Sequence, residues 1–429
     1  MRIILGIAIG LVLVLSFSFF YPGDKANVAV VKVIKDKQGF KLYRNNEPYF
    51  IKGAGGYAYY DKLNSYGGNS VRLWTTEGAE KYLDEAQRLG LSVTLGLDMA
   101  LERHGFDYNN KKNVAEQLER LKKEVLRLKD HPALLMWGVG NEVDQFAKNY
   151  NVWNAVNDLA GYIHKVDPAH PTTTMLAGVP KKHIAEIVKR CPNLDVLSIN
   201  AFRELPYIKN KIAEAGWTGP YLIGEWGASG YWETEKTPWG AFLEETSTEK
   251  AEVCKMRYEQ AVGNENDKCI GSYVFYWGYK QARTHTLLSL FLESGEEIGV
   301  IDVLQKLWTG KTPSNSAPLI KPVGIDDKMT SAGAYLSPGS LHAAYTDAED
   351  PDKDPLLYKW EIFHESQEKK EGGDKENKPG AVSDLILDGS GKQLSFKAPA
   401  TEGAYRLFVY VFDGRNHVAT ANAPFYVRN

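Results

Sequence analysis

Only three cysteines occur among the 429 residues of this chain: Cys191, Cys254 and Cys269. Three thiols allow one disulfide bond at most. Cys254 and Cys269 are the candidate pair, and free buried thiols are an equally weighted alternative.

The chain also lacks a strong charge of either sign. It has 51 basic and 54 acidic residues and a formal net charge of −3, which gives no electrostatic footprint for nucleic acid. Metal-ligand spacings, phosphate loops and nucleotide-binding fingerprints are absent as well. We therefore expect no cofactor, no metal ion and no nucleic-acid partner.

Aromatic residues are plentiful by comparison. They make up 12% of the chain and include 10 tryptophans. Aromatic rings suit the apolar face of a sugar, and a large hydrophobic core uses them equally well. Their number agrees with carbohydrate binding without deciding it.

Eight short apolar runs have the composition of buried strands, and helical patterns fill most of the gaps. The runs cover residues 49–54, 70–75, 92–98, 134–140, 172–177, 196–200, 221–224 and 272–277. The helical patterns cover residues 80–89, 113–128, 152–166, 181–190, 207–215 and 249–262. This alternation matches the roughly 250-residue length of a (β/α)8 TIM barrel, which is the predicted fold of residues 28–310.

One predicted strand ends in a carboxylate. The run from His131 is apolar until it reaches Asn141 and Glu142. Residues that follow a buried parallel strand lie at the carboxyl end of the sheet, where α/β folds bind ligands. A lone glutamate there is more often a solvent-exposed residue than a catalytic one.

A second run of the same form makes a catalytic role for Glu142 the favoured interpretation. Residues 220–227 again contain a short apolar run followed by Gly224, Glu225 and Trp226. Glu142 and Glu225 are separated by about three βα units of roughly 30 residues each. In a closed barrel both glutamates then face one mouth.

The sequence from His131 to Glu142 resembles the acid/base signature of glycoside hydrolase family 2 and its clan of barrel glycosidases. Asn141 and Glu142 fall where the clan has the end of strand four, and Glu225 falls at the end of strand seven. Asp130 departs from the family pattern, which more often has Asn there. The resemblance spans about residues 40–310 and implies a retaining mechanism, with Glu142 as acid/base and Glu225 as nucleophile.

The two glutamates, considered without the resemblance, indicate the same retaining mechanism. Two carboxyl groups about 5 to 5.5 Å apart supply the proton and the nucleophile of a retaining glycosidase. Glu142 is expected to be protonated at rest because a neighbouring carboxylate disfavours a second negative charge. Glu225 must be ionised, and Arg72 ends strand two where the clan places an arginine.

Further substrate contacts are expected from residues near the strand ends. Asn141 resembles the asparagine that binds the sugar 2-hydroxyl, with a turn or helix cap as the alternative. Trp277 resembles the strand-eight aromatic beneath the sugar, with core packing as the alternative. On strand six Phe202 stands where many clan members have Tyr or His, so Asn200 or a nearby tyrosine is the expected substitute.

Other aromatic and polar side chains are candidates of lower specificity. His104, after strand three, is either a substrate contact or an exposed loop residue. Four tryptophans either line further subsites or anchor core and loops, namely Trp74, Trp226, Trp232 and Trp239. The loop 228–248 is long and carries several aromatics, which favours an endo-acting cleft over a pocket for one terminal sugar.

The N-terminus opens with an uncharged apolar segment, residues 3–20. It is longer than a usual signal-peptide core and has no clean cleavage motif. We expect export to the periplasm, the cell surface or the medium, with an uncleaved membrane anchor as the alternative. Residues 1–27 are excluded from the fold, and residues 28–43 predict a hairpin that closes the barrel.

The pattern changes after the turn-rich linker 311–318. Alternating strands at 341–344, 356–363, 393–397, 405–412 and 418–427 predict an immunoglobulin-like β-sandwich over residues 319–429. The acidic turn 347–355 resembles a turn of cadherin-like folds; a solvated turn is the expectation, with calcium as the alternative. The polar segment 366–380 is expected to be a mobile loop.

These observations predict an exported, monomeric retaining β-glycoside hydrolase whose partner is its carbohydrate substrate. A single barrel followed by such a domain is also similar to the endo-β-1,3-glucanases of glycoside hydrolase family 158, so β-1,3-glucan is the first expected substrate, with β-mannan or β-galactoside next. The alternatives are a transglycosylase and a non-catalytic glycan-binding protein on a barrel scaffold.

Overall fold

A computed structural model describes residues 28–263, 268–326, 328–329, 333–371 and 373–429. Its centre is a closed barrel of eight strands in which every neighbouring pair is parallel. The strands are β4 (Ile51–Gly55), β5 (Ser70–Leu73), β6 (Ser92–Leu97), β7 (Leu134–Asn141), β8 (Thr172–Ala177), β9 (Val196–Asn200), β10 (Tyr221–Trp226) and β11 (Cys269–Phe275). The predicted TIM barrel is therefore confirmed.

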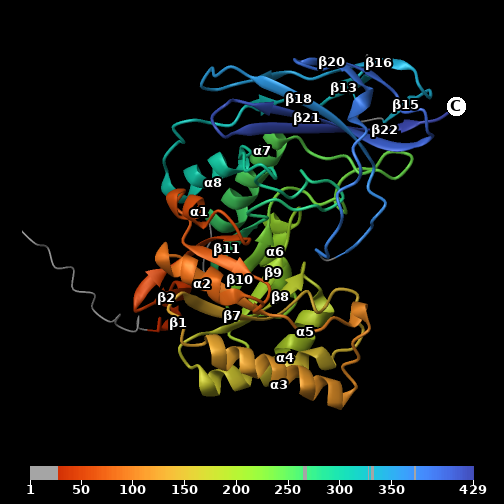
Figure 1. The fold of residues 1–429 in the computed structure, drawn as a ribbon. Helices are drawn as coiled ribbons and strands as arrows, with labels where there is room; N and C mark the ends of the chain where they lie inside the picture. Colours follow the sequence, from red (N-terminus) through yellow and green to blue (C-terminus); the bar gives the residue numbers. More distant parts are fainter. Residues whose placement is uncertain (1–27, 264–267, 327, 330–332, 372) are drawn as a thin grey trace, which may run out of the picture.

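A helix follows each barrel strand and covers its outer face (Figure 1). The helices are α1 (Tyr60–Ser65), α2 (Ala79–Arg88), α3 (Lys111–Leu128), α4 (Asn151–Val166), α5 (Lys181–Arg190), α6 (Ile208–Glu214), α7 (Ser247–Tyr258) and α8 (Val300–Thr309). Helix α3 packs through Leu121, Val125 and Leu128, which are spaced to form one apolar face. The described residues contain no helix of the length and apolarity that a bilayer crossing requires, and the apolar segment 3–20 lies outside them.

The amino end of the barrel is closed by the predicted hairpin. Strands β1 (Val31–Asp36) and β2 (Gly39–Arg44) pair antiparallel, and β3 (Glu47–Tyr49) joins them. Val31 and Leu42 share one buried cluster with Ile51 and Leu222, which begin or lie near the beginning of barrel strands. The opposite end, where the strands finish, is left for the site.

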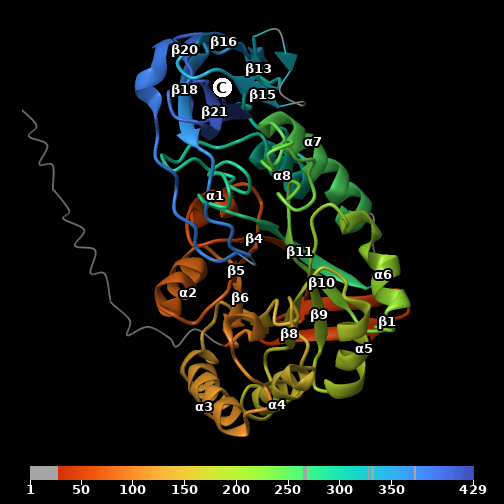
Figure 2. The same ribbon diagram turned by 90° about the vertical axis from the view of Figure 1, so that its right-hand side faces the viewer.

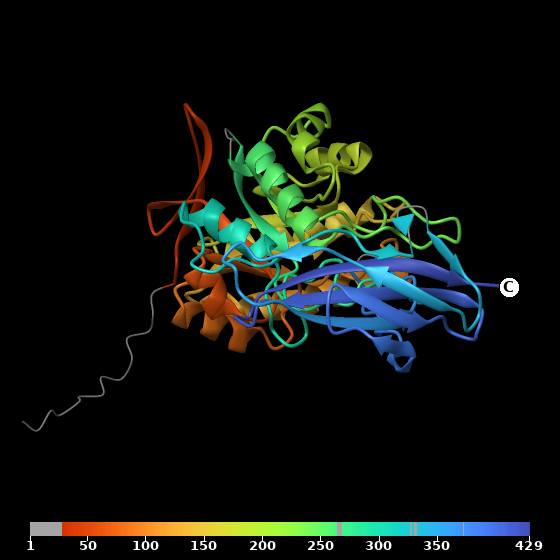
Figure 3. The same cartoon turned by 90° about the horizontal axis from the view of Figure 1, so that it is seen from above.

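The C-terminal part consists of β-sheets that lie across one side of the barrel (Figure 3). One sheet has the order β14-β13-β16-β20-β19 and the other β15-β22-β21-β18. Their strands are β13 (Gly324–Ile325), β14 (Lys328–Met329), β15 (Ala334–Leu336), β16 (Leu341–Tyr345), β18 (Leu357–His364), β19 (Ile386–Asp388), β20 (Gln393–Lys397), β21 (Gly403–Phe412) and β22 (Val418–Val427), with β12 (Leu319–Ile320) paired to β17 (Ala348–Glu349). Both sheets contribute to one buried core. The immunoglobulin-like topology stays a prediction.

Two smaller expectations concern the cysteines and the acidic turn. All three cysteines are buried thiols outside any disulfide bond, so the candidate pair Cys254 and Cys269 is not bridged. In the acidic turn, Asp347 is paired with Lys392 and Lys321. None of the described residues forms a cluster of carboxylate, imidazole and thiol groups suited to a metal ion.

Candidate active site

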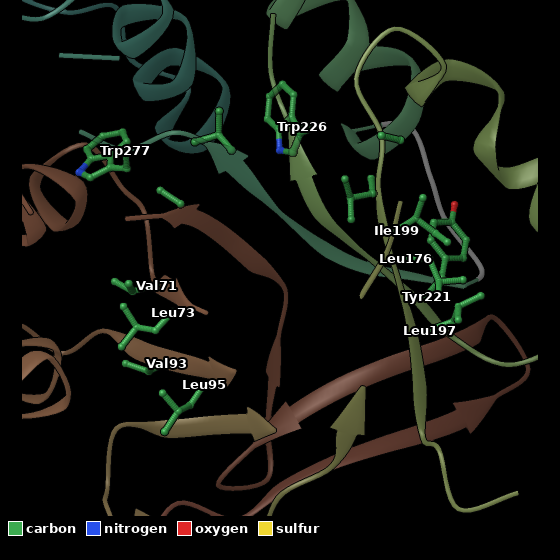
Figure 4. Packing of buried hydrophobic residues seen from close by; sticks show 14 of the residues in the cluster. Val71, Leu73, Val93, Leu95, Leu176, Leu197, Ile199, Tyr221, Trp226 and Trp277 are labelled. Carbon is green, nitrogen blue, oxygen red and sulfur yellow. The ribbon is translucent and has the colours of Figure 1, made fainter. Parts of the chain in front are cut away.

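Arg72 stands at the centre of the barrel mouth because side chains alternate along β5. Val71 and Leu73 point outward into the core between strands and helices (Figure 4). Ser70 points inward, where its hydroxyl lies 2.7 Å from the Tyr273 hydroxyl. Arg72 continues this inner face one layer higher and is 1% exposed.

A bulge in β10 turns Glu225 toward the same place. The pairing of β10 with β9 shifts register between Ile223 and Glu225, and such irregularities re-aim the side chain that follows. Gly224 is needed beside it, because a Cβ there would lie 2.6 Å from Asn200 Oδ1. The close approach lets the Gly224 carbonyl accept a hydrogen bond from Arg72 at 2.7 Å.

The end of β7 is bent in a similar way. Gly140 has φ 79° and Glu142 has φ 49°, both in the left-handed region, which non-glycine residues occupy only at a cost. The Glu142 amide donates to the Met175 carbonyl at 2.8 Å and so holds this conformation. Strained backbone of this kind is typical of functional sites and directs Glu142 into the mouth.

Glu225 is surrounded by hydrogen-bond donors. Arg72 Nη1 donates to Glu225 Oε1 at 2.9 Å, and Trp74 Nε1 donates to the same oxygen at 2.9 Å. The Arg72 guanidinium also lies 5.0 Å from the centre of the Trp74 ring. An ionised carboxylate is an acceptor only, so this environment fits the charged form.

Glu142 has a different environment. Burial, and next the negative charge of Glu225, raise the pKa of Glu142 to about 7. Asn200 Nδ2 donates to Glu142 Oε1 at 2.9 Å and opposes part of that rise. At neutral pH a large fraction of Glu142 therefore keeps its proton, as a general acid requires.

A buried aspartate behind Glu142 adds to this effect. Asp144 accepts hydrogen bonds from the Ala177 amide, and burial raises the pKa of Asp144 to about 6. Its charge contributes to the raised pKa of Glu142. Asp144 was not among the residues predicted for the site, and its position two residues after Glu142 is the signal in the sequence that could have indicated it.

Asn141 and Asn200 join the two glutamates into one network. Arg72 Nη2 donates to Asn141 Oδ1 at 2.5 Å, and Asn200 Nδ2 lies 3.3 Å from the same oxygen. Arg72 contacts Glu225 while Asn200 contacts Glu142. The structure thus brings together five of the residues predicted near the strand ends, namely Arg72, Asn141, Glu142, Asn200 and Glu225.

The network opens into a cavity of about 1040 Å³. This is at the upper end of the range of small-molecule sites, roughly 300–1000 Å³. Trp74, Phe275 and Tyr276 supply aromatic wall around the glutamates, and Glu371 and Asp374 of the C-terminal part line it too. A cavity of this size admits a ligand larger than one sugar.

The prediction that Trp277 lies beneath the sugar is wrong, because Trp277 does not line the cavity. It is 1% exposed, donates from Nε1 to the Tyr59 carbonyl at 3.0 Å and packs against Phe291. Strand β11 ends at Phe275, two residues before Trp277. Phe275 and Tyr276 therefore occupy the position at the mouth that we expected for Trp277. Which of these neighbouring aromatic residues faces the cavity depends on the exact residue at which the strand ends.

Trp226 is also in the core rather than at the mouth (Figure 4). It is the neighbour of Glu225 on a strand, so it faces the opposite side of β10. There its ring lies 5.5 Å from Tyr258 of α7. The expectation that Trp226 contacts substrate is corrected accordingly.

The remaining candidates fall in different places. Trp74 and Trp232 line the cavity, whereas the Trp239 ring lies 5.1 Å from Tyr335 of the C-terminal part. His104 is outside the wall, and its Nε2 lies 3.0 Å from Asp374, which is part of the wall. Phe202 lines the cavity without any hydroxyl, and Asn200 contacts the acid instead.

Residues 81–237 match the family model described as glycosyl hydrolases family 2, TIM barrel domain. This range contains Glu142 and Glu225. The chain is also 25% identical over 146 residues to a β-glucuronidase of Sus scrofa and 27% identical over 159 residues to a β-galactosidase of Thermoanaerobacter pseudethanolicus. Each match covers 33% of this chain but only 21% and 20% of those proteins, so the chain spans about a fifth of each relative.

A solved structure shares the fold. It is a β-glucuronidase from Ruminococcus gnavus in complex with C6-substituted uronic isofagomine, with a TM-score of 0.51 and 14% identity. The superposition covers 65% of this chain and 52% of that chain. At this identity the likeness concerns the fold.

Proposed function

We propose that the chain is a retaining β-glycoside hydrolase. The observation that carries the proposal is the pair Glu142 and Glu225, which line one cavity in different surroundings: Arg72 donates to Glu225, whereas burial and the charge of Glu225 raise the pKa of Glu142. The glycosidases named among the relatives support the class of reaction. Two carboxyl groups in unlike environments are what hydrolysis of a glycosidic bond needs.

In the first step Glu142 gives its proton to the glycosidic oxygen while a Glu225 oxygen bonds to the anomeric carbon. The bond between that carbon and the leaving oxygen breaks, and the leaving sugar departs with the proton. Glu225 loses its negative charge when the ester forms. Burial still raises the pKa of Glu142, but the added effect of the Glu225 charge is then gone, so the carboxylate left on Glu142 suits the role of base.

In the second step Glu142 takes a proton from water, and the water oxygen bonds to the anomeric carbon. The ester bond to Glu225 breaks, which restores its carboxylate and leaves the proton on Glu142. Arg72 and Trp74 donate to Glu225 throughout the cycle and orient the oxygen that attacks. Asn141, fixed by Arg72, has its amide nitrogen available for the sugar 2-hydroxyl.

The first substrate we propose is β-1,3-glucan, cleaved within the chain. The order of a single barrel and a β-domain resembles the family 158 endo-β-1,3-glucanases, and the volume of the cavity suits several sugars. β-Mannan and β-galactoside are next, and the β-glucuronidase among the relatives adds β-glucuronide to the substrates to be tested. Transfer to an acceptor sugar in place of water uses the same two steps.

The test is early-time NMR of the products from this panel of polysaccharides and aryl β-glycosides. We expect the β-anomer to be released first, with products of several lengths from the preferred polysaccharide. Release of the α-anomer overturns the role of Glu225 as nucleophile. Binding of a glycan with no bond cleavage on any substrate overturns the proposal in favour of a glycan-binding protein.

A further inference from the structure

The loop between β18 and β19 reaches from the C-terminal sheets down to the barrel mouth (Figures 1 and 2). The sequence predicts a mobile loop over 366–380, and the structure shows where the described residues of this loop contact the barrel. Residues 368–371 and 373–378 make specific contacts with three different barrel loops. Lys370, Glu371, Gly373, Asp374 and Glu376 line the cavity that contains the two glutamates.

Arg283 fastens one side of this loop. Its amide and its Nη1 donate to the two oxygens of Glu376 at 2.6 and 2.5 Å, and its Nη2 donates to Glu371 at 3.2 Å. The guanidinium also lies 4.2 Å from the centre of the Tyr231 ring. Glu376 is 7% exposed, so its pairing with Arg283 holds the loop in a defined place.

The other side of the loop is fastened across the mouth. Asp374 lies 3.5 Å from Arg103 Nη2 and 3.0 Å from His104 Nε2. Lys280 Nζ donates to the Gly373 carbonyl at 3.0 Å. The loop therefore connects residues that follow β11, namely Lys280 and Arg283, with residues that follow β6.

The order of the barrel strands shows which half of the mouth this loop covers. In the closed barrel β11, β4, β5 and β6 are consecutive neighbours. A loop fastened beyond β11 and beyond β6 spans that half. The loop reaches the other half, β7 to β10, at Tyr231, whose hydroxyl donates to Glu371 at 2.7 Å, and side chains of the barrel border the rest of that half.

Three exposed aromatic residues belong to that second half. Phe146, Tyr207 and Trp232 follow β7, β9 and β10, and they are 66%, 65% and 51% exposed. All three line the cavity. Large aromatic side chains that are exposed to solvent around a cavity indicate a binding surface. The faces of their rings suit the apolar faces of pyranose rings.

We propose that the cleft between this loop and the three rim aromatics binds several consecutive β-linked neutral hexoses of one glycan chain. The inference rests on the proposed function and adds the subsites outside the reacting sugar. Glu371 and Glu376 share Arg283, and Asp374 is paired with Arg103. Three carboxylates thus face two arginines, and this surplus of acceptor oxygens suits the hydroxyl groups of a neutral sugar better than an anionic sugar.

The experiment measures binding without cleavage, in the full chain carrying Glu225→Ala. The probes are β-1,3-linked gluco-oligosaccharides and β-1,4-linked manno-oligosaccharides, from disaccharide to hexasaccharide, titrated by calorimetry. We expect affinity to rise with length in one series. Adding Tyr207→Ala or Trp232→Ala should lower the affinity for the longest probe about tenfold, as when one anchoring aromatic is removed, and leave the disaccharide less affected.

Conservative variants and a distant control make the result specific. Tyr207→Phe and Trp232→Phe keep a ring and should keep most of the affinity for the hexasaccharide. Arg283→Gln, which loosens the loop, should weaken long probes, whereas Phe50→Ala, an aromatic 38% exposed before β4, should change nothing.

Equal affinity for all lengths, or alanine variants that bind like Phe50→Ala, overturns the inference and leaves the proposed function in place. If the unsubstituted chain cleaves no glycoside in the product assay, the proposed function fails, whatever the binding data show. Tighter binding of β-glucuronide oligomers than of neutral ones overturns the assignment to neutral sugars.

Discussion

Glu142 and Glu225 lie in one cavity but in opposite surroundings. Glu225 receives hydrogen bonds from a buried guanidinium and an indole. Glu142 receives one from a neutral amide, and burial together with the charge of Glu225 raises its pKa to about 7. One mouth therefore supports a charged carboxylate and a protonated one, which divides the nucleophile from the acid.

The difference between the two surroundings arises from local backbone geometry. A register shift turns Glu225 toward Arg72, and a left-handed residue after β7 places Glu142 beside Asn200. The two glutamates differ because different side chains contact them. Replacing Glu225, Glu142 or a neighbour that shifts the pKa of Glu142 should therefore change the kinetics in a different way in each case.

The largest effect is expected from Glu225→Ala. Without a nucleophile the ester cannot form, so kcat on every substrate should fall by about 10⁴-fold or more. Steady-state hydrolysis of an aryl β-glycoside measures it. The matched control is Glu235→Ala, which changes an exposed glutamate in the loop that follows β10 and should keep its activity. Activity of Glu225→Ala within tenfold of the unsubstituted chain would place the nucleophile elsewhere.

A smaller and substrate-dependent loss is expected from Glu142→Ala. A general acid raises the reaction rate by about 10²- to 10⁴-fold. This increase is seen only with substrates whose leaving oxygen needs a proton. Kinetics on oligosaccharides and on dinitrophenyl glycosides should therefore differ. The first step should survive on the dinitrophenyl substrate and be lost on the oligosaccharide. Equal losses on both would contradict the role of Glu142 as proton donor.

The smallest effect is a pH shift caused by Asp144→Asn. The charge of Asp144 helps to raise the pKa of Glu142, so its removal should lower that pKa. Because the acid must be protonated, the alkaline limb of kcat/KM should move to lower pH. Asp130→Asn, whose side chain is 70% exposed, should leave the profile unchanged. A shift to higher pH in Asp144→Asn would contradict the assigned coupling.

The barrel was predictable because its strands are buried on both faces and therefore read as continuous apolar runs. The predicted 172–177 and 196–200 coincide with β8 and β9. The ends of strands were less accessible, since β11 stops at Phe275 while the aromatic run continues to Trp277. Deciding which aromatic faces the mouth requires the strand end to within one residue.

The carboxylate pair was predictable from its spacing and its strand-end position. The role of Trp74 as a donor to Glu225 was not, because an indole gives no sign in the sequence of the oxygen it will meet. The part of the wall contributed by Lys370, Glu371, Gly373, Asp374 and Glu376 was also not predicted, since a polar segment rich in Lys and Glu has the composition of a mobile loop. Its contacts are made with barrel residues such as Arg283, which lie far away in the sequence.

The β18–β19 loop has a consequence for how the protein is made. During synthesis the chain emerges from its N-terminus at about 5–20 residues per second, and domains fold as units in that order. Both glutamates belong to the barrel, whereas the loop that completes their cleft is translated about a hundred residues after the last barrel strand begins. The reactive groups of the barrel are therefore synthesised before the loop that completes their cleft, and the full cleft exists only after the C-terminal sheets that carry this loop have formed.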